Sequence, residues 1–451
     1  MAKTLGITVL PEYFQSEGVK GLLDHLQAHA PVTGIATSPY VMAESDPERG
    51  QREPPADAGS GEKRLLDRPL WGKREVWVET APSFEPNRQL YEGTSYQPAP
   101  IDELGRREGG IVREFIGEAK SRGIEVLLQV QAAIPPGYRV QFGGPVDADR
   151  PMLPDGSFPP RRLALNGSLA SEDILAYGEA LIRDLLEQYP EADGVRIDWP
   201  EYPPYFFDDL FVDFNPQVQP HAEALGMDFE LLKKAVTAIR EDLFAAETVR
   251  DVEHHLDRLS ENINDLIRLK GTLVQNLMKR YRGVVGESKK LIPGIFPAPW
   301  DQFAGSSPYN VRDHSDAVFC KFYTMHWPMI VDHYRSDLLA RNSDWDPLEL
   351  TRVLVEWLGI DEWCDGTAPE HYTYPGPSTP HPVSGFEDKI DVAETLADGV
   401  PLVPIAHSYG PVDDFRSRLK ATWEASRHGV WINRYAYVSD EKLKAIGEVC
   451  R

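Results

Sequence analysis

One segment near the middle of the chain reads Ala192-Asp-Gly-Val-Arg-Ile-Asp-Trp-Pro-Glu-Tyr-Pro-Pro-Tyr205. Its first part, 194–198, is a short apolar run typical of a buried strand, and the prolines that follow end it. Side chains alternate along a strand, so Arg196 and Asp198 share one face. Glu201 follows shortly after, among aromatic rings. The segment therefore predicts a strand that carries an arginine and two carboxylates to its C-terminal end.

Short runs of the same kind recur along the whole chain, and helical patterns separate them. The strand candidates are 6–10, 33–37, 125–130, 194–198, 292–296, 317–323, 402–406 and 430–433. Apolar residues spaced by three or four predict helices at 18–28, 110–122, 171–188, 347–359, 415–427 and 440–449. Strands that alternate with helices in this number predict a (β/α)8 TIM barrel, built as a single domain over residues 1–451. An open doubly wound sheet is the alternative, although no Gly-x-Gly-x-x-Gly turn follows any candidate strand.

Two connections are longer than a barrel requires. Segment 40–104 is polar and rich in proline and glycine, and its two tryptophans, Trp71 and Trp77, favour an ordered lid over the barrel mouth. Segment 228–288 has helical spacing over many turns and predicts a long helix or helical hairpin that projects from the barrel after the fourth strand. Such a projection could mediate homo-oligomer contacts. A helix pair packed within one chain is the alternative.

The overall composition restricts the partners and the compartment. The chain has 71 acidic and 47 basic residues, a net charge of −24, which argues against nucleic acid and anionic membranes as partners. Cys320, Cys364 and Cys450 lie far apart and match no disulfide framework or metal-ligand spacing, which favours a reducing compartment. The first apolar run is too short for a signal peptide, and no window is long enough to span a membrane. We therefore expect a cytoplasmic protein without a metal or other cofactor.

Polar and aromatic residues gather at the expected C-terminal ends of the strands, where barrels of this type build their active sites. Aromatic faces stack on pyranose rings, and paired carboxylates can divide acid and base or nucleophile work. This mixture of side chains is typical of a carbohydrate site. The candidates, in chain order, are Glu12, Gln131, Arg196, Asp198, Trp199, Glu201, Tyr202, Trp300, Asp301, Lys321, Tyr323, His326, His407 and Asn433.

The central strand resembles known sugar-cleaving enzymes. Residues 194–198, Gly-Val-Arg-Ile-Asp, resemble the Gly-x-Arg-x-Asp strand of the α-amylase clan. Together with Asn166-Gly-Ser and the Tyr-Pro that follows Glu201, the segment is similar to a bacterial glycosyl-hydrolase-like barrel family, over about the central third of the chain. The resemblance implies that Asp198 is a nucleophile and that Arg196 holds it ionised. The chain departs from the α-amylase clan because no Glu follows the fifth strand and no Asn-His-Asp follows the seventh.

Since the resemblance supplies no catalytic acid, two residues compete for that role. Glu201 has apolar neighbours that would raise its pKa, as a general acid needs. Asp301 follows the fifth strand beside Trp300, which offers a stacking surface, and its alternative role is that of a helix N-cap. Asp198 would be the nucleophile or base, with a strand-end cap or a simple ion pair with Arg196 as the alternative.

The sequence therefore predicts a glycoside hydrolase that acts on a small carbohydrate or glycoside. The remaining candidate residues would bind the substrate. Two alternatives stay open. One is a non-hydrolytic sugar-active barrel enzyme, an isomerase or lyase that could be metal-assisted. The other is a carbohydrate-binding protein without catalytic activity.

Overall fold

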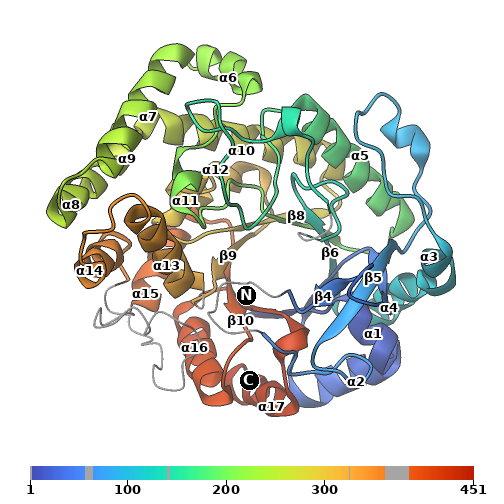
Figure 1. Cartoon of the computed structure of the whole chain (residues 1–451). Helices are drawn as coiled ribbons and strands as arrows, with labels where there is room; N and C mark the ends of the chain where they lie inside the picture. The colour runs from blue at the N-terminus through green and yellow to red at the C-terminus, as the bar shows by residue number, and fades with distance from the viewer. Residues whose placement is uncertain (1–2, 56–63, 140–142, 325, 361–384) are drawn as a thin grey trace.

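A closed barrel of eight parallel strands forms the centre of the computed structural model (Figure 1). The structure describes residues 3–55, 64–139, 143–324, 326–360 and 385–451. The barrel strands are β1 (Thr4–Thr8), β2 (Gly34–Thr37), β6 (Glu125–Gln131), β7 (Gly194–Asp198), β8 (Lys290–Ile295), β9 (Val318–Phe322), β10 (Leu402–His407) and β11 (Gly429–Asn433). Each strand pairs in parallel with its neighbour, and β11 closes the barrel against β1. The predicted (β/α)8 barrel is confirmed, and every strand candidate overlaps one of these strands.

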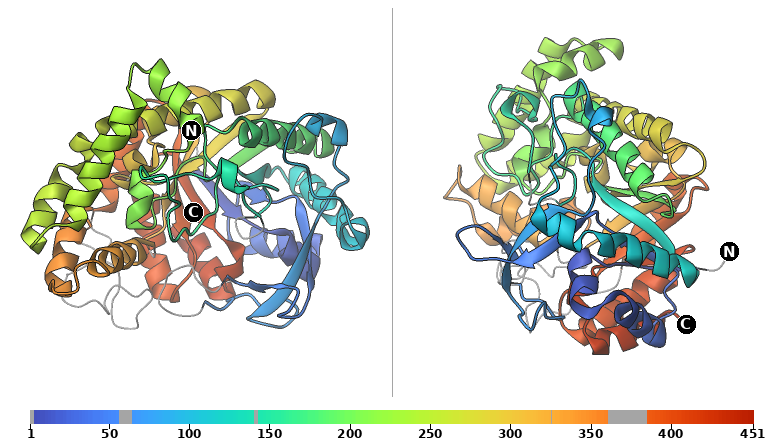
Figure 2. Two further views of the ribbon diagram at one scale, coloured as in Figure 1. Left: turned by 45° about the horizontal axis from the view of Figure 1, so that its top comes forward. Right: turned by 90° about the vertical axis from the view of Figure 1, so that its right-hand side faces the viewer.

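Helices surround the barrel (Figures 1 and 2), and their apolar residues are buried in the core. The main ones are α1 (Pro11–Glu17), α2 (Val19–His29), α4 (Gly110–Ser121), α5 (Glu172–Gln188), α10 (Asn264–Val285), α13 (His326–Leu339), α14 (Pro347–Trp357), α15 (Phe386–Ala397), α16 (Val412–Ala425) and α17 (Asp440–Val449). Helix α5 shows how the sequence sets such a helix: Ser171 caps its N-terminus by accepting a hydrogen bond from the backbone N–H of Ile174.

The described part of segment 40–104 contains a small sheet. Strands β3 (Tyr40–Glu44), β4 (Gln51–Glu53) and β5 (Val76–Pro82) pair antiparallel in the order β3-β5-β4. Helix α3 (Glu103–Glu108) follows before α4. Both tryptophans of this segment are half-buried. The sheet is a separate unit that joins β2 to α4, where a plain barrel would have a short loop.

Segment 228–288 is helical throughout its main part. It contains α7 (Phe229–Phe244), α8 (Val249–Asp257), α9 (Leu259–Asn262) and α10, preceded by α6 (Gln219–Ala224). Helix α10 packs against α5 and against strand β8 as a member of the ring. Helices α7 and α8 lie at the outer edge of the molecule, where α8 packs against α14 (Figure 1). The segment therefore divides into a ring helix and an outer pair that is packed against the same chain.

An apolar cluster that includes Trp431, Phe319, Leu127, Ile292 and Val403 packs inside the barrel. Trp431 on β11 lies 4.7 Å from the ring of Phe319, and its Nε1 donates to Thr8 Oγ1 at 3.1 Å. Glycine at position 6 makes room for this indole, because a Cβ atom there would lie 1.9 Å from it. This apolar cluster forms the floor beneath the side chains at the C-terminal end of the barrel.

The cysteines and the helices give two further facts about the fold. Cys320 and Cys450 are buried free thiols, and Cys364 lies outside the described residues. Among the helices of the described segments, none combines the length and the apolar character needed to cross a membrane.

Candidate active site

A pocket of about 190 Å³ opens at the C-terminal ends of the barrel strands. It brings together many of the residues predicted from the sequence. The predicted residues that line it are Gln131, Asp198, Trp199, Lys321, Tyr323, His326, His407 and Asn433. The other lining residues are Thr8, Leu10, Ser38, Pro55, Arg64, Gln129, Arg139, Leu163, Tyr205, Arg434 and Tyr437.

Asp198 ends strand β7 and faces this pocket. Its side chain is largely buried, with 9% of the residue exposed. Lys321, on strand β9, places its Nζ atom 3.7 Å from Asp198 Oδ1. Asp198 is the one carboxylate among the described residues that line the pocket. The pocket therefore presents an acid whose neighbouring cation comes from a strand on the other side of β8.

The prediction that Arg196 contacts Asp198 is wrong. Arg196 is fully buried inside the barrel, where its Nη1 donates to Thr8 Oγ1 at 2.9 Å and its guanidinium lies 5.7 Å from the ring centre of Phe319. Residues two apart on a strand share a face but lie about 6.6 Å apart along it. Arg196 therefore occupies a deeper layer than Asp198, and Lys321 is the cation beside the acid.

Glu201 lies just behind the pocket wall and is completely buried. Its Oε1 atom accepts a hydrogen bond from Lys321 Nζ at 2.6 Å, and its Oε2 atom has no hydrogen-bond partner among the described residues. Burial raises the pKa of Glu201 to about 7, an effect that the Lys321 ammonium opposes and the Asp198 charge adds to. The carboxyl group can therefore hold a proton near neutral pH.

Trp199 separates the two acids in the sequence and forms part of the pocket surface. Its backbone has a φ of +60°, in the left-handed region that bulky residues rarely adopt. Its ring stacks on Tyr205 with the ring centres 5.6 Å apart, and Lys321 Nζ lies 5.3 Å from the indole centre. The unusual backbone turn directs Asp198 and the indole into the same pocket. Strain of this kind often marks a functional segment.

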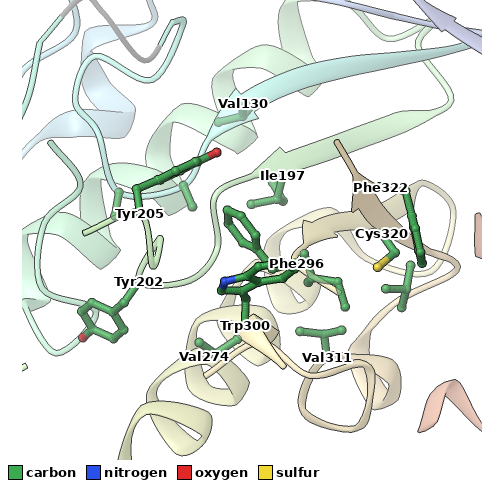
Figure 3. Close-up of a cluster of buried hydrophobic side chains, with 14 of the residues drawn as sticks. Val130, Ile197, Tyr202, Tyr205, Val274, Phe296, Trp300, Val311, Cys320 and Phe322 are labelled. Atoms are coloured by element: carbon green, nitrogen blue, oxygen red, sulfur yellow. The ribbon is translucent and has the colours of Figure 1, made fainter. Parts of the chain in front are cut away.

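Six predicted residues do not line the pocket: besides Arg196, Glu201 and Glu12, they are Tyr202, Trp300 and Asp301. Trp300 and Asp301 begin the short helix α11 (Trp300–Ala304), which directs the indole into the apolar core beside Phe296 (Figure 3). Burial raises the pKa of Asp301 to about 6, and its Oδ1 accepts from the backbone N–H of Gln302. Tyr202 donates its hydroxyl hydrogen to Asp213 and is fully buried. The structure does not bring these side chains to Asp198.

Glu12 also lies behind the wall instead of on it. It is fully buried at the start of α1, and Tyr40 donates its hydroxyl hydrogen to Glu12 Oε2 at 3.0 Å. Burial raises its pKa, with Glu53 adding to the effect and the guanidiniums of Arg139 and Arg434 opposing it. Glu12 is thus the inner member of a charged cluster whose arginines reach the pocket.

The two histidines of the pocket are neutral donors or acceptors. Burial, together with the nearby Arg64 cation, holds the pKa values of His326 and His407 well below the ordinary value. Nδ1 of His407 accepts a hydrogen bond from the backbone N–H of Tyr409 at 3.0 Å, so its ring proton is on Nε2. His326 Nδ1 pairs with the hydroxyl of Tyr205 at 3.0 Å.

Sequence reasoning missed the arginines of the pocket. Arg434 directly follows strand β11, next to the predicted Asn433, so its place at a strand end was a usable signal. Arg139 and Arg64 come from irregular segments, where no periodicity indicates direction. Within the described ranges, no group of three or more His, Cys, Asp or Glu side chains is arranged to hold a metal ion.

Comparisons with known proteins identify relatives of the fold. No protein-family model matches the sequence, and no curated protein matches it. Solved structures with a similar fold include the PgaB (BpsB) glycoside hydrolase domain from Bordetella bronchiseptica, with a TM-score of 0.50, 12% identity and coverage of 99% of both chains. The catalytic domain of β-amylase from Paenibacillus polymyxa has a TM-score of 0.51 and 9% identity, over 100% of this chain and 98% of that one. A β-galactosidase from Marinomonas ef1 has a TM-score of 0.50 and 10% identity, over 99% of this chain and 59% of that one. At these identities the likeness concerns the fold, a (β/α)8 barrel that the chain shares with structures described as glycoside hydrolases.

Proposed function

We propose that this protein hydrolyses glycosidic bonds in the pocket at the C-terminal end of the barrel, with Asp198 as the carboxylate that meets the substrate. The observation that carries the proposal is the position of Asp198. It ends a central strand, faces a pocket lined by aromatic rings, and has Lys321 Nζ 3.7 Å from its Oδ1 atom. A carboxylate in this position can act on a bound sugar as a nucleophile or as a base.

The pocket surface supports a sugar as the substrate. Trp199, Tyr205 and Tyr323 supply flat apolar faces, while Gln131 and Asn433 supply amides that can bind hydroxyl groups. The fold relatives include structures described as a glycoside hydrolase domain, a β-amylase and a β-galactosidase, which is consistent with a carbohydrate substrate.

Glu201 is the better of the two candidate proton sources. Its pKa of about 7 keeps a proton available near neutral pH, and it contacts Lys321, which lines the pocket. Asp301 has no such connection, because its side chain hydrogen-bonds within its own helix. We assign Glu201 the role of supplying, through Lys321, the proton that the departing oxygen takes. Asp198 then either attacks the anomeric carbon directly or activates the water that does so.

One observation favours a second function. Lys321 is a buried amine that lines the pocket beside two carboxyl groups, and a lysine in such a place can form an imine with a carbonyl substrate, releasing water. A lyase acting on a keto sugar would use this chemistry. The contacts of Lys321 Nζ with Glu201 Oε1 at 2.6 Å and with Asp198 Oδ1 at 3.7 Å argue for the hydrolase, because a nitrogen that forms an imine has fewer N–H groups left to make them.

A single screen distinguishes the two functions. The wild-type protein is incubated with a panel of α- and β-linked 4-methylumbelliferyl glycosides, including uronides, and released fluorophore is measured. Separately, the protein is mixed with keto sugars and keto acids and treated with borohydride, which reduces an imine to a stable secondary amine. Fluorophore release without a mass increase on Lys321 supports hydrolysis. A borohydride-dependent adduct on Lys321 without any glycoside cleavage would replace it with the lyase.

A further inference from the structure

Charged side chains lie on two opposite sides of the pocket, and we call each side a wall. Asp198 ends β7, and Arg434 directly follows β11. In the closed barrel of the described chain, three strands separate β7 from β11 in either direction, so these two residues lie across the mouth from one another. A sugar ring bound against Asp198 therefore has its opposite edge directed toward Arg434.

A carboxylate from the small sheet fixes the arginines on the side of the pocket near Arg434. Glu53, on β4, is buried and binds two guanidiniums at once: Arg139 Nη2 donates to its Oε2 and Arg434 Nη2 donates to its Oε1. Although burial acts in the opposite direction, these two arginines lower the pKa of Glu53 below its ordinary value. Glu53 thus holds both guanidiniums in place at the edge of the pocket.

Arg434 keeps donors available to a ligand. A guanidinium has five N–H groups, and within the described residues the hydrogen bond from Nη2 to Glu53 is the one that this side chain makes. Its guanidinium carbon lies 5.5 Å from the ring centre of Tyr437, which restricts the orientation of the fork. His407 also lines the pocket, and its Nε2–H group is a further hydrogen-bond donor for a ligand.

The charges of this wall are opposite in sign to the charge of the chain. Arg64, Arg139 and Arg434 line the pocket, and Asp198, across the mouth from Arg434, is the one carboxylate among its described lining residues. A chain with a net charge of −24 repels anions at long range, so a cluster of guanidiniums in its pocket is a local feature. Neutral hydroxyl groups do not need such a cluster, whereas carboxylates and phosphates match the guanidinium fork with two parallel hydrogen bonds.

We propose that the sugar unit bound in this pocket carries an anionic group, a carboxylate as in a uronic acid or a phosphate ester, and that Arg434 receives this group on the wall opposite Asp198. The inference rests on the proposed function, since it names the substrate class of the same pocket. It assigns Glu53 the role of a positioning residue that holds the Arg434 and Arg139 guanidiniums.

Ligand binding tests this inference without requiring any bond cleavage. Isothermal titration compares D-glucuronate, D-galacturonate, glucose 6-phosphate and galactose 6-phosphate with glucose and galactose. We expect at least one acidic sugar to bind 10-fold or more tightly than its neutral parent, and 0.5 M NaCl to reduce the difference. Preference for the uronates identifies a carboxylate, and preference for the 6-phosphates identifies a phosphate. Equal binding of neutral and acidic sugars, or no binding of any acidic sugar, would overturn the inference.

Variants localise the effect to Arg434. Arg434→Gln should abolish the preference for the acidic sugar, and Arg434→Lys, which keeps the charge but loses the fork, should retain only part of it. Arg68→Gln is the matched control, because Arg68 also pairs with acids and lies 4.4 Å from a tyrosine ring centre but does not line the pocket. If circular dichroism shows that Arg434→Gln does not fold, the binding preference of Arg434→Lys decides the test. A folded Arg434→Lys protein that keeps the full preference for the acidic sugar would contradict the role of the two parallel N–H donors of the guanidinium. Anion preference in a protein that cleaves no glycoside would refute the proposed hydrolysis and leave this inference standing.

Discussion

Lys321 Nζ donates a hydrogen bond to Glu201 Oε1 at 2.6 Å and lies 3.7 Å from Asp198 Oδ1, so one buried ammonium serves two carboxyl groups. Lys321 is 2% exposed, and Glu201 is fully buried. Breaking a buried ion pair by removing one partner is costly, because the remaining charge cannot be solvated. This arrangement makes Lys321 the neighbouring cation of both carboxyl groups.

Replacing Lys321 by Met should destabilise the protein more at high pH than at low pH. Burial already raises the pKa of Glu201 to about 7 in the folded chain, so this group's contribution to stability falls as the pH rises from its ordinary pKa, 4.5, through 7. Without the ammonium the pKa rises further and the decline extends to higher pH. We expect a loss of about 3–5 kcal/mol at pH 8 and a smaller loss at pH 5, from urea unfolding.

An exposed pair provides the control for this measurement. Lys290 pairs with Glu125 at the surface, with 47% of the lysine side chain exposed. Lys290→Met should cost less than about 1 kcal/mol at either pH. Equal losses at pH 5 and pH 8 for Lys321→Met would show that the ammonium does not control the ionisation of Glu201.

Replacing Glu201 by Gln should remove the alkaline limb of the pH–rate profile. If protonated Glu201 supplies the proton, kcat/KM falls as the pH rises through about 7, where this carboxyl group loses its proton. The amide cannot donate in this way, so kcat should drop by roughly 10²–10⁴-fold and the remaining activity should not vary around pH 7. The profile is measured from pH 5 to 9 on the best glycoside of the panel.

Glu394→Gln is the matched control for this variant. Glu394 is also a buried carboxyl group, but it pairs with Arg427 just before β11 begins, at the opposite end of the barrel from the pocket. Its substitution should leave the pH profile unchanged. An alkaline limb that persists in Glu201→Gln would mean that another group supplies the proton.

Two glycine substitutions should change stability in opposite directions. A Cβ atom on Gly6 would lie 1.9 Å from the rigid indole of Trp431, so Gly6→Ala should destabilise the fold by about 3 kcal/mol or more. Gly21 lies on the exposed face of α2, and a Cβ atom there would meet nothing within 4 Å. Gly21→Ala should therefore stabilise the protein by about 0.5–1 kcal/mol. Chemical unfolding of both variants checks the pair, and a stable Gly6→Ala protein would contradict the barrel packing.

The barrel could be predicted from the sequence because its signal is local and repeated. Each strand is a short β-type run, and a helical pattern follows most of them, so alternation alone indicated the (β/α)8 order. The first strand begins slightly earlier than expected, at Thr4 instead of position 6, since polar Thr4 carries no apolar signal. Asp198 and Lys321 could also be predicted, because inward-facing residues at strand ends meet in any closed barrel.

The rest of the site depends on relationships that sequence spacing does not carry. Arg196 shares a face with Asp198 but lies one layer deeper, which alternation cannot distinguish. The turn of α11 directs Trp300 into the core, and a strand-end position gives no information on that direction. The ion pair between Arg434 and Glu53 joins residues that are 381 positions apart in the sequence. No local pattern links two such positions, so the charged wall could be found only from the structure.

The most direct test of the proposed function compares Asp198→Asn with Asp301→Asn. Both substitutions change one oxygen for an amide at a largely buried aspartate, but Asp198 lines the pocket and Asp301 does not. On a glycoside that the wild-type protein cleaves, we expect kcat to fall by roughly 10³-fold or more in Asp198→Asn, in line with the loss of an essential catalytic group. It should stay within a few-fold of wild type in Asp301→Asn. Unchanged hydrolysis by Asp198→Asn, or hydrolysis abolished in a folded Asp301→Asn protein, would contradict the assignment of Asp198 as the catalytic carboxylate.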